Sequence, residues 1–143
     1  MIEIGRIQNL EVQTVDERGA WLGQGDELVL LPRAELPAGL APGQRLRVFV
    51  YRAVADLPAA TLRLPQAQVG EFALLRVSSV TKHGAFLEWG LEKELLVPFA
   101  EQPERMRVGR RYLVKVRLDA QGRTVASARI DRNLEPGPGD PAE

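Results

Sequence analysis

The chain has 143 residues, with 19 Lys or Arg against 19 Asp or Glu, so its formal net charge is zero. It has no cysteine, which excludes disulfides, thiolate catalysis and a cysteine zinc site. Its first residues read as a strand, not a signal peptide, and no apolar run approaches membrane-spanning length. We therefore expect a soluble cytoplasmic protein with no membrane partner.

The sequence repeats itself. Residues 5–25 written over 70–90 agree at eight of 21 positions without a gap, where ordinary composition gives roughly one or two. The identical pairs are Gly5/Gly70, Leu10/Leu75, Val12/Val77, Val15/Val80, Gly19/Gly84, Ala20/Ala85, Leu22/Leu87 and Gly25/Gly90. With one added residue the register resumes, from Leu30/Leu96 to Val50/Val116. The repeat predicts two small units, which have modest cores and are expected to lean on each other.

Apolar and polar residues alternate through both copies, as in β-strands. In the first copy we expect a long bent strand over 2–15, a second strand from Gly19, and further strands at 28–31, 46–50 and 60–64. A glycine at the start of the second strand fits a tight turn or a close backbone approach. The prolines of 32–43 allow one helical turn at most.

The second copy repeats this scheme. Its strands are expected at 72–80, 85–89, 95–97, 112–118 and 124–130, with a helical turn within 101–106 and a hairpin turn at 119–123. Five short strands with a turn between the third and fourth are typical of an OB-fold barrel. The prediction is an all-β chain with two tandem barrels, at 1–66 and 67–134, and a disordered Pro/Gly-rich tail at 135–143.

Strand geometry selects the candidate site. Ala85, Leu87 and Trp89 must face the core, because the opposite choice would bury Glu88. Phe86 then looks outward, beside basic residues of the hairpin and the fourth strand. An exposed ring among cations is how single-stranded nucleic acid is bound. In the alternative, purely structural interpretation, the outward ring packs against the neighbouring copy. The candidate binding residues are Phe86, His83, Lys82, Lys115, Arg117 and Arg123, with Trp21 and Arg18 as their counterparts in the first copy.

Charge favours the second copy. Residues 1–66 carry 7 Arg against 8 Asp or Glu, whereas residues 67–134 carry 12 Lys or Arg against 8. A polyanion is therefore expected on the second barrel.

The sequence does not favour an enzyme. His83 is the only histidine, so a histidine metal cluster is excluded and any Ser-His-Asp triad would have to use it. It lies on a hairpin between a lysine and a glycine, with no apparent carboxylate to orient it. The G-Q-G of 23–25 lacks the rest of a phosphate loop. We expect no enzyme activity, no cofactor and no metal.

Four runs carry a family resemblance: G-E-F-A-L-L-R-V-S-S-V-T-K-H-G-A-F-L-E-W-G, E-L-L-V-P-F-A-E, V-G-R-R-Y-L-V-K-V and D-A-Q-G-R-T-V-A-S. They resemble the S-one RNA-binding domain, an OB-fold repeat of a ribosomal protein. The tandem pair, with W-G-L-E-K-E-L-L-V-P-F-A-E-Q, V-F-V-Y and A-A-T-L-R-L-P, is similar to the front half of the conserved virulence factor B family of bacterial RNA-binding regulators.

The resemblance implies RNA binding on the face of Phe86 and the position before Gly84, which His83 occupies. Two departures stand out. Pro98 and Pro32 replace the family's histidine on the third strand, and the first copy's last hairpin, 52–57, does not show the pattern of acidic and arginine residues expected there. The first copy therefore looks like the weaker binder.

The leading hypothesis is a non-catalytic regulator that binds single-stranded RNA, chiefly through its second barrel. Phe86 would stack a base and His83 a second base or a ribose, while Lys82, Arg117 and Arg123 would contact phosphates. Single-stranded DNA is a possible ligand, since stacking alone does not separate it from RNA. The alternative is an adaptor that holds a protein partner on the same barrels, as the near-neutral charge and the two prolines suggest. Sequence preference and oligomeric state stay open.

Overall fold

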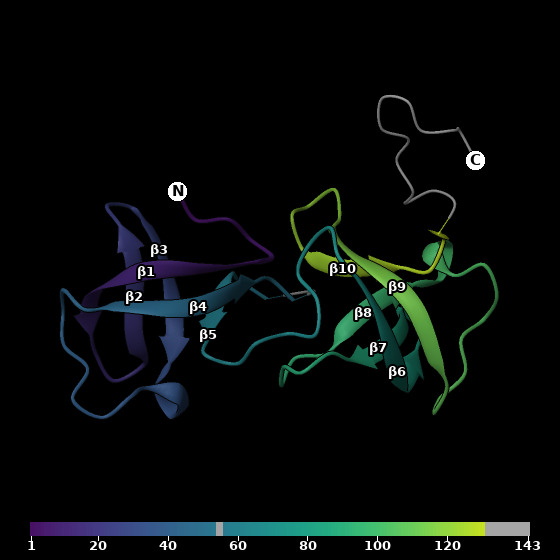
Figure 1. Ribbon diagram of the computed structural model, residues 1–143, viewed down its shortest axis with the longest axis horizontal. Helices are drawn as coiled ribbons and strands as arrows, with labels where there is room; N and C mark the ends of the chain where they lie inside the picture. The colour runs from purple at the N-terminus through teal and green to yellow at the C-terminus, as the bar shows by residue number, and fades with distance from the viewer. Residues whose placement is uncertain (54–55, 131–143) are drawn as a thin grey trace.

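Two closed five-stranded β-barrels make up the computed structural model, which describes residues 1–53 and 56–130 (Figure 1). This all-β architecture confirms the two predicted OB-fold barrels. The expected tail at 135–143 lies outside the described residues. Within the described part of the chain, no helix has the length and hydropathy to cross a membrane.

The two barrels contain the same elements in the same order. The first is built from β1 (Arg6–Val15), β2 (Gly19–Gln24), β3 (Glu27–Pro32), a 3-10 turn η1 (Arg33–Glu35), β4 (Arg45–Tyr51) and β5 (Ala59–Thr61). The second is built from β6 (Phe72–Thr81), β7 (Gly84–Glu88), β8 (Leu95–Pro98), η2 (Phe99–Glu101), β9 (Arg111–Leu118) and β10 (Thr124–Ser127). Around the barrels the strands run β1-β2-β3-β5-β4 and β6-β7-β8-β10-β9, and only the third and fifth strands of each pair in parallel.

The expected helical turn within 101–106 is wrong in position, because η2 lies at Phe99–Glu101. Pro98 ends β8 in an extended conformation (φ −60°, ψ 153°), and the turn begins directly after it. The first barrel behaves identically, with η1 directly after Pro32. A proline has no N–H to donate to the sheet ladder, so regular strand pairing ends at this residue.

Both fifth strands are shorter than predicted, and a glutamate explains where they end. Glu35 of η1 accepts hydrogen bonds from the hydroxyl of Thr61 and from the backbone N–H of Leu62, both at 2.8 Å. The bond to Leu62 takes a donor that a longer strand would need. In the second barrel, Glu101 of η2 accepts from the hydroxyl of Ser127 at 2.6 Å. In both copies, a glutamate of the 3-10 turn thus accepts hydrogen bonds at the end of the fifth strand.

Glycine is required where the second strand begins. A Cβ on Gly84 would lie 2.3 Å from the carbonyl oxygen of Val97, and one on Gly19 would lie 2.0 Å from that of Leu31. Both glycines also have positive φ values, 138° and 148°, which L-residues rarely adopt. The close backbone approach predicted from the sequence is confirmed.

The two barrels share a core. Phe49 of β4 is fully buried, yet it belongs to the hydrophobic cluster of the second barrel. Its ring meets that of Trp89 at 83° with centroids 5.6 Å apart, and it stacks on Tyr51 at 6.1 Å. Aromatic pairs in these arrangements contribute about 0.5–1.5 kcal/mol beyond the area they bury. The expectation that the copies lean on each other is confirmed.

Candidate nucleic-acid interface

The alternation predicted along β7 is confirmed. Ala85 and Leu87 are fully buried and Trp89 is 1% exposed, whereas Phe86 is half-buried on the outer face and Glu88 is exposed. In β2 the corresponding Leu22 is buried and Trp21 is half-buried. Both rings are therefore outside the barrel interiors, where a flat partner could reach them.

An apolar row continues from Phe86 across two further strands. Phe86 pairs with Leu96 of β8, and Leu96 pairs with Val125 of β10. Leu96 and Val125 are 7% and 3% exposed, but neither belongs to a barrel core cluster. Residues paired across a sheet point to the same face, so these two extend the outer surface of Phe86. Sequence reasoning missed them, although alternation with the core residues Leu95 and Val97 could have placed Leu96 outside.

A pocket of about 280 Å³ borders Phe86 and Leu96 of this row, where the two barrels meet. Its walls come from both barrels: Ala53 and Asp56 from the first, and His83, Phe86, Lys93, Glu94, Leu96 and Thr124 from the second. The structure thus brings together two predicted site residues, Phe86 and His83. It adds a wall from the first barrel that the sequence did not reveal.

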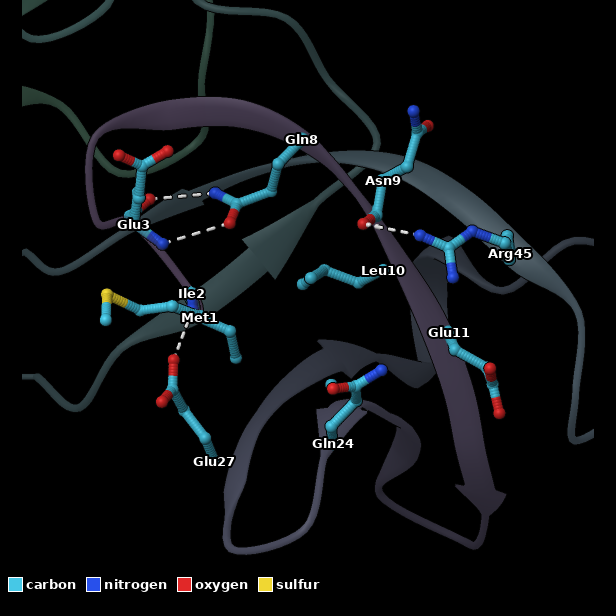
Figure 2. Close-up of a pocket in the computed structure, with 11 residues that line it drawn as sticks. Met1, Ile2, Glu3, Gln8, Asn9, Leu10, Glu11, Gln24, Glu27 and Arg45 are labelled. Carbon is cyan, nitrogen blue, oxygen red and sulfur yellow. Dashed lines mark hydrogen bonds between the residues drawn. The ribbon is translucent and has the colours of Figure 1, made fainter.

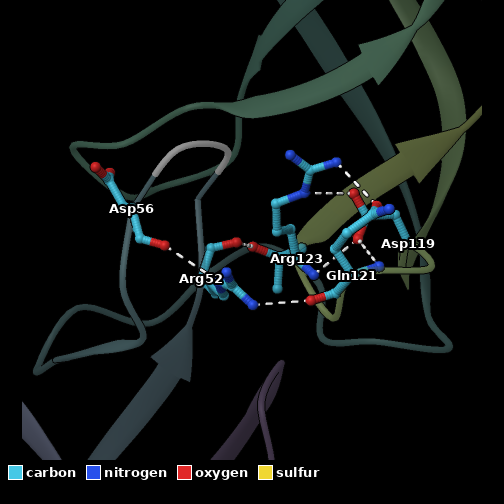
Figure 3. A network of polar contacts seen from close by, with 6 residues as sticks. Arg52, Asp56, Asp119, Gln121 and Arg123 are labelled. Atoms are coloured by element: carbon cyan, nitrogen blue, oxygen red, sulfur yellow. Dashed lines mark hydrogen bonds and ion pairs between the residues drawn. The ribbon is translucent and has the colours of Figure 1, made fainter.

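Arg52, directly after β4, joins this wall to the second barrel (Figure 3). Its Nη1 donates to the carbonyl of Gln121 at 2.8 Å, and its Nε donates to the carbonyl of Asp56 at 3.1 Å. Its own carbonyl accepts from the backbone N–H and the hydroxyl of Thr124, at 2.8 and 2.9 Å. The first barrel therefore fixes the start of β10 and the hairpin before it.

That hairpin holds Arg123 in a set orientation (Figure 3). Arg123 Nε donates to Asp119 Oδ2 at 2.7 Å, and Nη2 donates to the side-chain oxygen of Gln121 at 3.1 Å. Burial raises the pKa of Asp119, but hydrogen bonds from Arg123 and the backbone of Gln121 outweigh it and leave the pKa below its ordinary value. Arg123 thus lies near the contact between the two barrels, and the carboxylate of Asp119 balances part of its charge.

The placement of Lys115 and Arg117 beside Phe86 is wrong. Both project outward from β9 as alternation predicts, but β6 separates β9 from β7 on one side, and β8 and β10 separate them on the other. Lys115 lies over the ring of Phe72, 5.7 Å from its centroid, and Arg117 pairs with Glu101 at 4.0 Å. Lys82 is exposed on the hairpin next to His83.

The corresponding surface of the first barrel carries a carboxylate beside its ring. Trp21 donates its indole N–H to Asp16 Oδ2 at 2.9 Å, and the backbone N–H of the exposed Arg18 donates to Oδ1 at 2.8 Å. The hydrogen bond from Trp21 is the main cause that holds the pKa of Asp16 below its ordinary value. Threonine occupies this position in the second copy, as Thr81. A charged carboxylate there disfavours phosphate near Trp21.

A second pocket, of about 300 Å³, lies in the first barrel (Figure 2). Three glutamates line it, Glu3, Glu11 and Glu27, and the backbone N–H of Ile2 donates to Glu27. Arg45 is the one basic side chain on its described walls, and it donates to the carbonyl of Asn9 at 3.4 Å. This excess of carboxylates is unsuited to a polyanion.

These two closed barrels, each with an outward aromatic on its second strand, define a tandem OB-fold chain. Comparison with known proteins agrees: residues 4–63, most of the first barrel, match the model of the S1 domain family. A solved structure of a multidomain protein with nucleic acid binding domains from Streptococcus pneumoniae TIGR4 superposes on 94% of the chain, with a TM-score of 0.73 and 19% identity. The resemblance to S-one domains predicted from the sequence is confirmed.

A curated relative is the uncharacterized protein YitL of Bacillus subtilis (strain 168), which is 26% identical over 100 residues, or 69% of this chain. The chain spans 34% of that protein's length and 50% of the solved streptococcal chain.

Proposed function

We propose that this chain binds single-stranded RNA without catalysis, chiefly through its second barrel, and acts in post-transcriptional regulation. The observation that carries the proposal is the half-buried ring of Phe86, which lines a pocket together with His83 and the apolar side chain of Leu96. Stacking of a base on an aromatic ring is worth about 1–3 kcal/mol and tolerates any base.

The comparisons support nucleic-acid binding in general. The first barrel matches the S1 domain family, and the streptococcal protein of the same fold is described as having nucleic acid binding domains. The choice of RNA over DNA rests on the resemblance to S-one RNA-binding domains, since base stacking alone does not distinguish the two.

The roles follow from position. Phe86 stacks a base, His83 receives a second base or a ribose, and the exposed Lys82 contacts a phosphate at the hairpin. Arg123 contacts a phosphate where the two barrels meet. Its pairing with Asp119 weakens this contact. Arg117 and Lys115 contact only an RNA long enough to continue around the barrel from β7 to β9, because β9 does not adjoin β7.

The first barrel is the weaker binder in this proposal. Asp16 lies beside Trp21, where the second barrel has an uncharged threonine. Trp21 and Arg18 then contribute only to longer RNA that passes both barrels.

Replacing Phe86 with alanine tests the proposal directly. The affinity for an unstructured oligoribonucleotide should fall by about 1–3 kcal/mol, measured by fluorescence anisotropy. Phe72→Ala is the matched control, because Phe72 is also an outward, partly exposed phenylalanine of the same barrel, on β6. Equal affinities of the parent and Phe86→Ala would refute the role of this ring.

Salt separates RNA binding from the alternative of a protein adaptor. Binding through phosphates should weaken steeply from low to physiological salt, because bound counterions are released. A chain that bound no oligonucleotide at low salt, yet held a protein partner with little salt dependence, would be an adaptor. A parallel titration with the DNA oligomer of the same sequence tests the choice of RNA.

A further inference from the structure

The pocket at the barrel junction has groups that stacking and phosphate binding leave unused. Besides Phe86 and His83 its walls carry an ammonium and two carboxylates, those of Lys93, Asp56 and Glu94. A carboxylate is purely an acceptor and repels phosphate. The groups of RNA that can donate to it are base N–H groups and the ribose hydroxyl.

The two carboxylates are not equivalent. Glu94 Oε1 already accepts a hydrogen bond from the hydroxyl of Ser78 at 2.5 Å. Asp56 Oδ2 lies 3.5 Å from Lys93 Nζ, and their side chains are 43% and 57% exposed. Exposed pairs of this kind contribute little to stability, about 0–1 kcal/mol, so a ligand can compete for both partners cheaply. Asp56 and Lys93 are therefore the groups available to read a base edge.

Together, Asp56 and Lys93 offer a cationic donor beside a pair of acceptors. Guanine presents the complement on its Watson–Crick edge: the O6 acceptor next to the N1–H and N2–H donors. Adenine and cytosine place a ring-nitrogen acceptor beside their amino group, and uracil flanks its one N–H with two carbonyls. Guanine is thus the base whose edge satisfies the ammonium and both carboxylate oxygens without facing an acceptor to an acceptor.

The pocket suits one base. Its volume of about 280 Å³ is just below the range of about 300–1,000 Å³ typical of sites for drug-sized ligands. Phe86 and Leu96 supply apolar surface for the ring faces. Asp56, the residue that would hydrogen-bond to the base, comes from the first barrel. Arg52 Nε donates a hydrogen bond to its backbone carbonyl at 3.1 Å and so fixes its position.

We infer that the junction pocket is a guanine-preferring subsite, in which Asp56 of the first barrel and Lys93 of the second read the base that enters beside Phe86. This inference rests on the proposed function, since it requires that RNA binds at Phe86. It makes the first barrel a specificity element for the second.

The test compares three short RNAs: an oligouridylate, the same oligomer with one central guanosine, and the same oligomer with one central inosine, which lacks the N2 amino group. The parent should bind the guanosine oligomer on the order of tenfold more tightly than the oligouridylate, with inosine between them. Asp56→Asn replaces one acceptor with a donor and should abolish the preference for guanosine over uridine, which is read as the ratio of the two affinities.

Glu88→Gln is the matched control. Glu88 is on the outer face of β7, pairs with Arg76 at 3.0 Å and lies outside the junction pocket. Glu88→Gln also removes one negative charge, but outside the pocket, so it should leave the guanosine preference unchanged. Equal affinities of the parent for all three oligomers, or a preference that survives in Asp56→Asn, would overturn the guanine subsite.

The two proposals fail differently. If no oligomer binds, RNA binding itself is refuted and the subsite falls with it. If all oligomers bind equally and Phe86→Ala weakens every one, RNA binding stands and the subsite alone is refuted.

Discussion

The rings of Phe49 and Trp89 meet nearly at right angles, with centroids 5.6 Å apart, although they belong to different barrels. Phe49 is outside its own barrel, between the core residues Val48 and Val50, and yet it is fully buried. The second barrel covers it and takes it into its own core.

Phe49→Ala should therefore destabilise the protein by about 3–5 kcal/mol, the usual cost of emptying a core phenylalanine site. Urea unfolding monitored by Trp fluorescence measures it. Phe72→Ala is the control: Phe72 is 37% exposed and should cost far less. Similar losses in the two variants would contradict a shared core.

Gly84→Ala should cost more stability than Gly109→Ala. Both glycines have positive φ, 138° and 89°, but a Cβ on Gly109 meets open space, whereas one on Gly84 meets the carbonyl oxygen of Val97. Conformational strain alone costs about 1–2 kcal/mol, which sets the expectation for Gly109. Denaturant midpoints would show the difference, and equal midpoints would mean that β8 can move aside.

Lys82→Ala should reduce the salt dependence of RNA binding more than Lys115→Ala. Lys82 is next to His83 on the exposed hairpin, whereas Lys115 lies over Phe72 on β9. Loss of one phosphate contact should lower the slope of log affinity against log salt by about 0.7 for a single strand. Titrations at several salt concentrations measure the slopes. A larger change for Lys115 would move the RNA path to β9.

Trp21→Phe should raise the pKa of Asp16, because the indole N–H is the main cause of its depression. A depressed carboxyl pKa stabilises the fold above the pKa of the unfolded chain, and this contribution is lost as the pH falls through the folded pKa. The variant should therefore show less acid sensitivity from this residue. Carboxyl NMR titration of Asp16 in both proteins checks it, and an unchanged pKa would contradict the assigned cause.

Strand alternation predicted which side chains face in and which face out. It placed Leu87 and Leu22 inside and Phe86 and Trp21 outside, as observed. It failed for Lys115 and Arg117 because alternation gives the face of a strand but not its neighbours around a closed barrel. In this topology β9 adjoins β6 and β10, not β7.

The junction could not be predicted for a similar reason. Phe49 reads as one more outward residue of a strand, and nothing local says that another barrel covers it. Arg52 and Asp56 fall in the segment that departs from the family's pattern, so the resemblance gave them no role. Their place in the pocket depends on how two compact units pack, which involves contacts far apart in the sequence.

A fragment that started at residue 67 would contain every strand of the second barrel, since the first of them begins at Phe72. It would still lack one side chain of its own interior, Phe49, and would expose Trp89 to water. Dissection at the boundary between the repeats would thus report the behaviour of a damaged module, and binding lost in such a fragment would say little about which half touches the ligand.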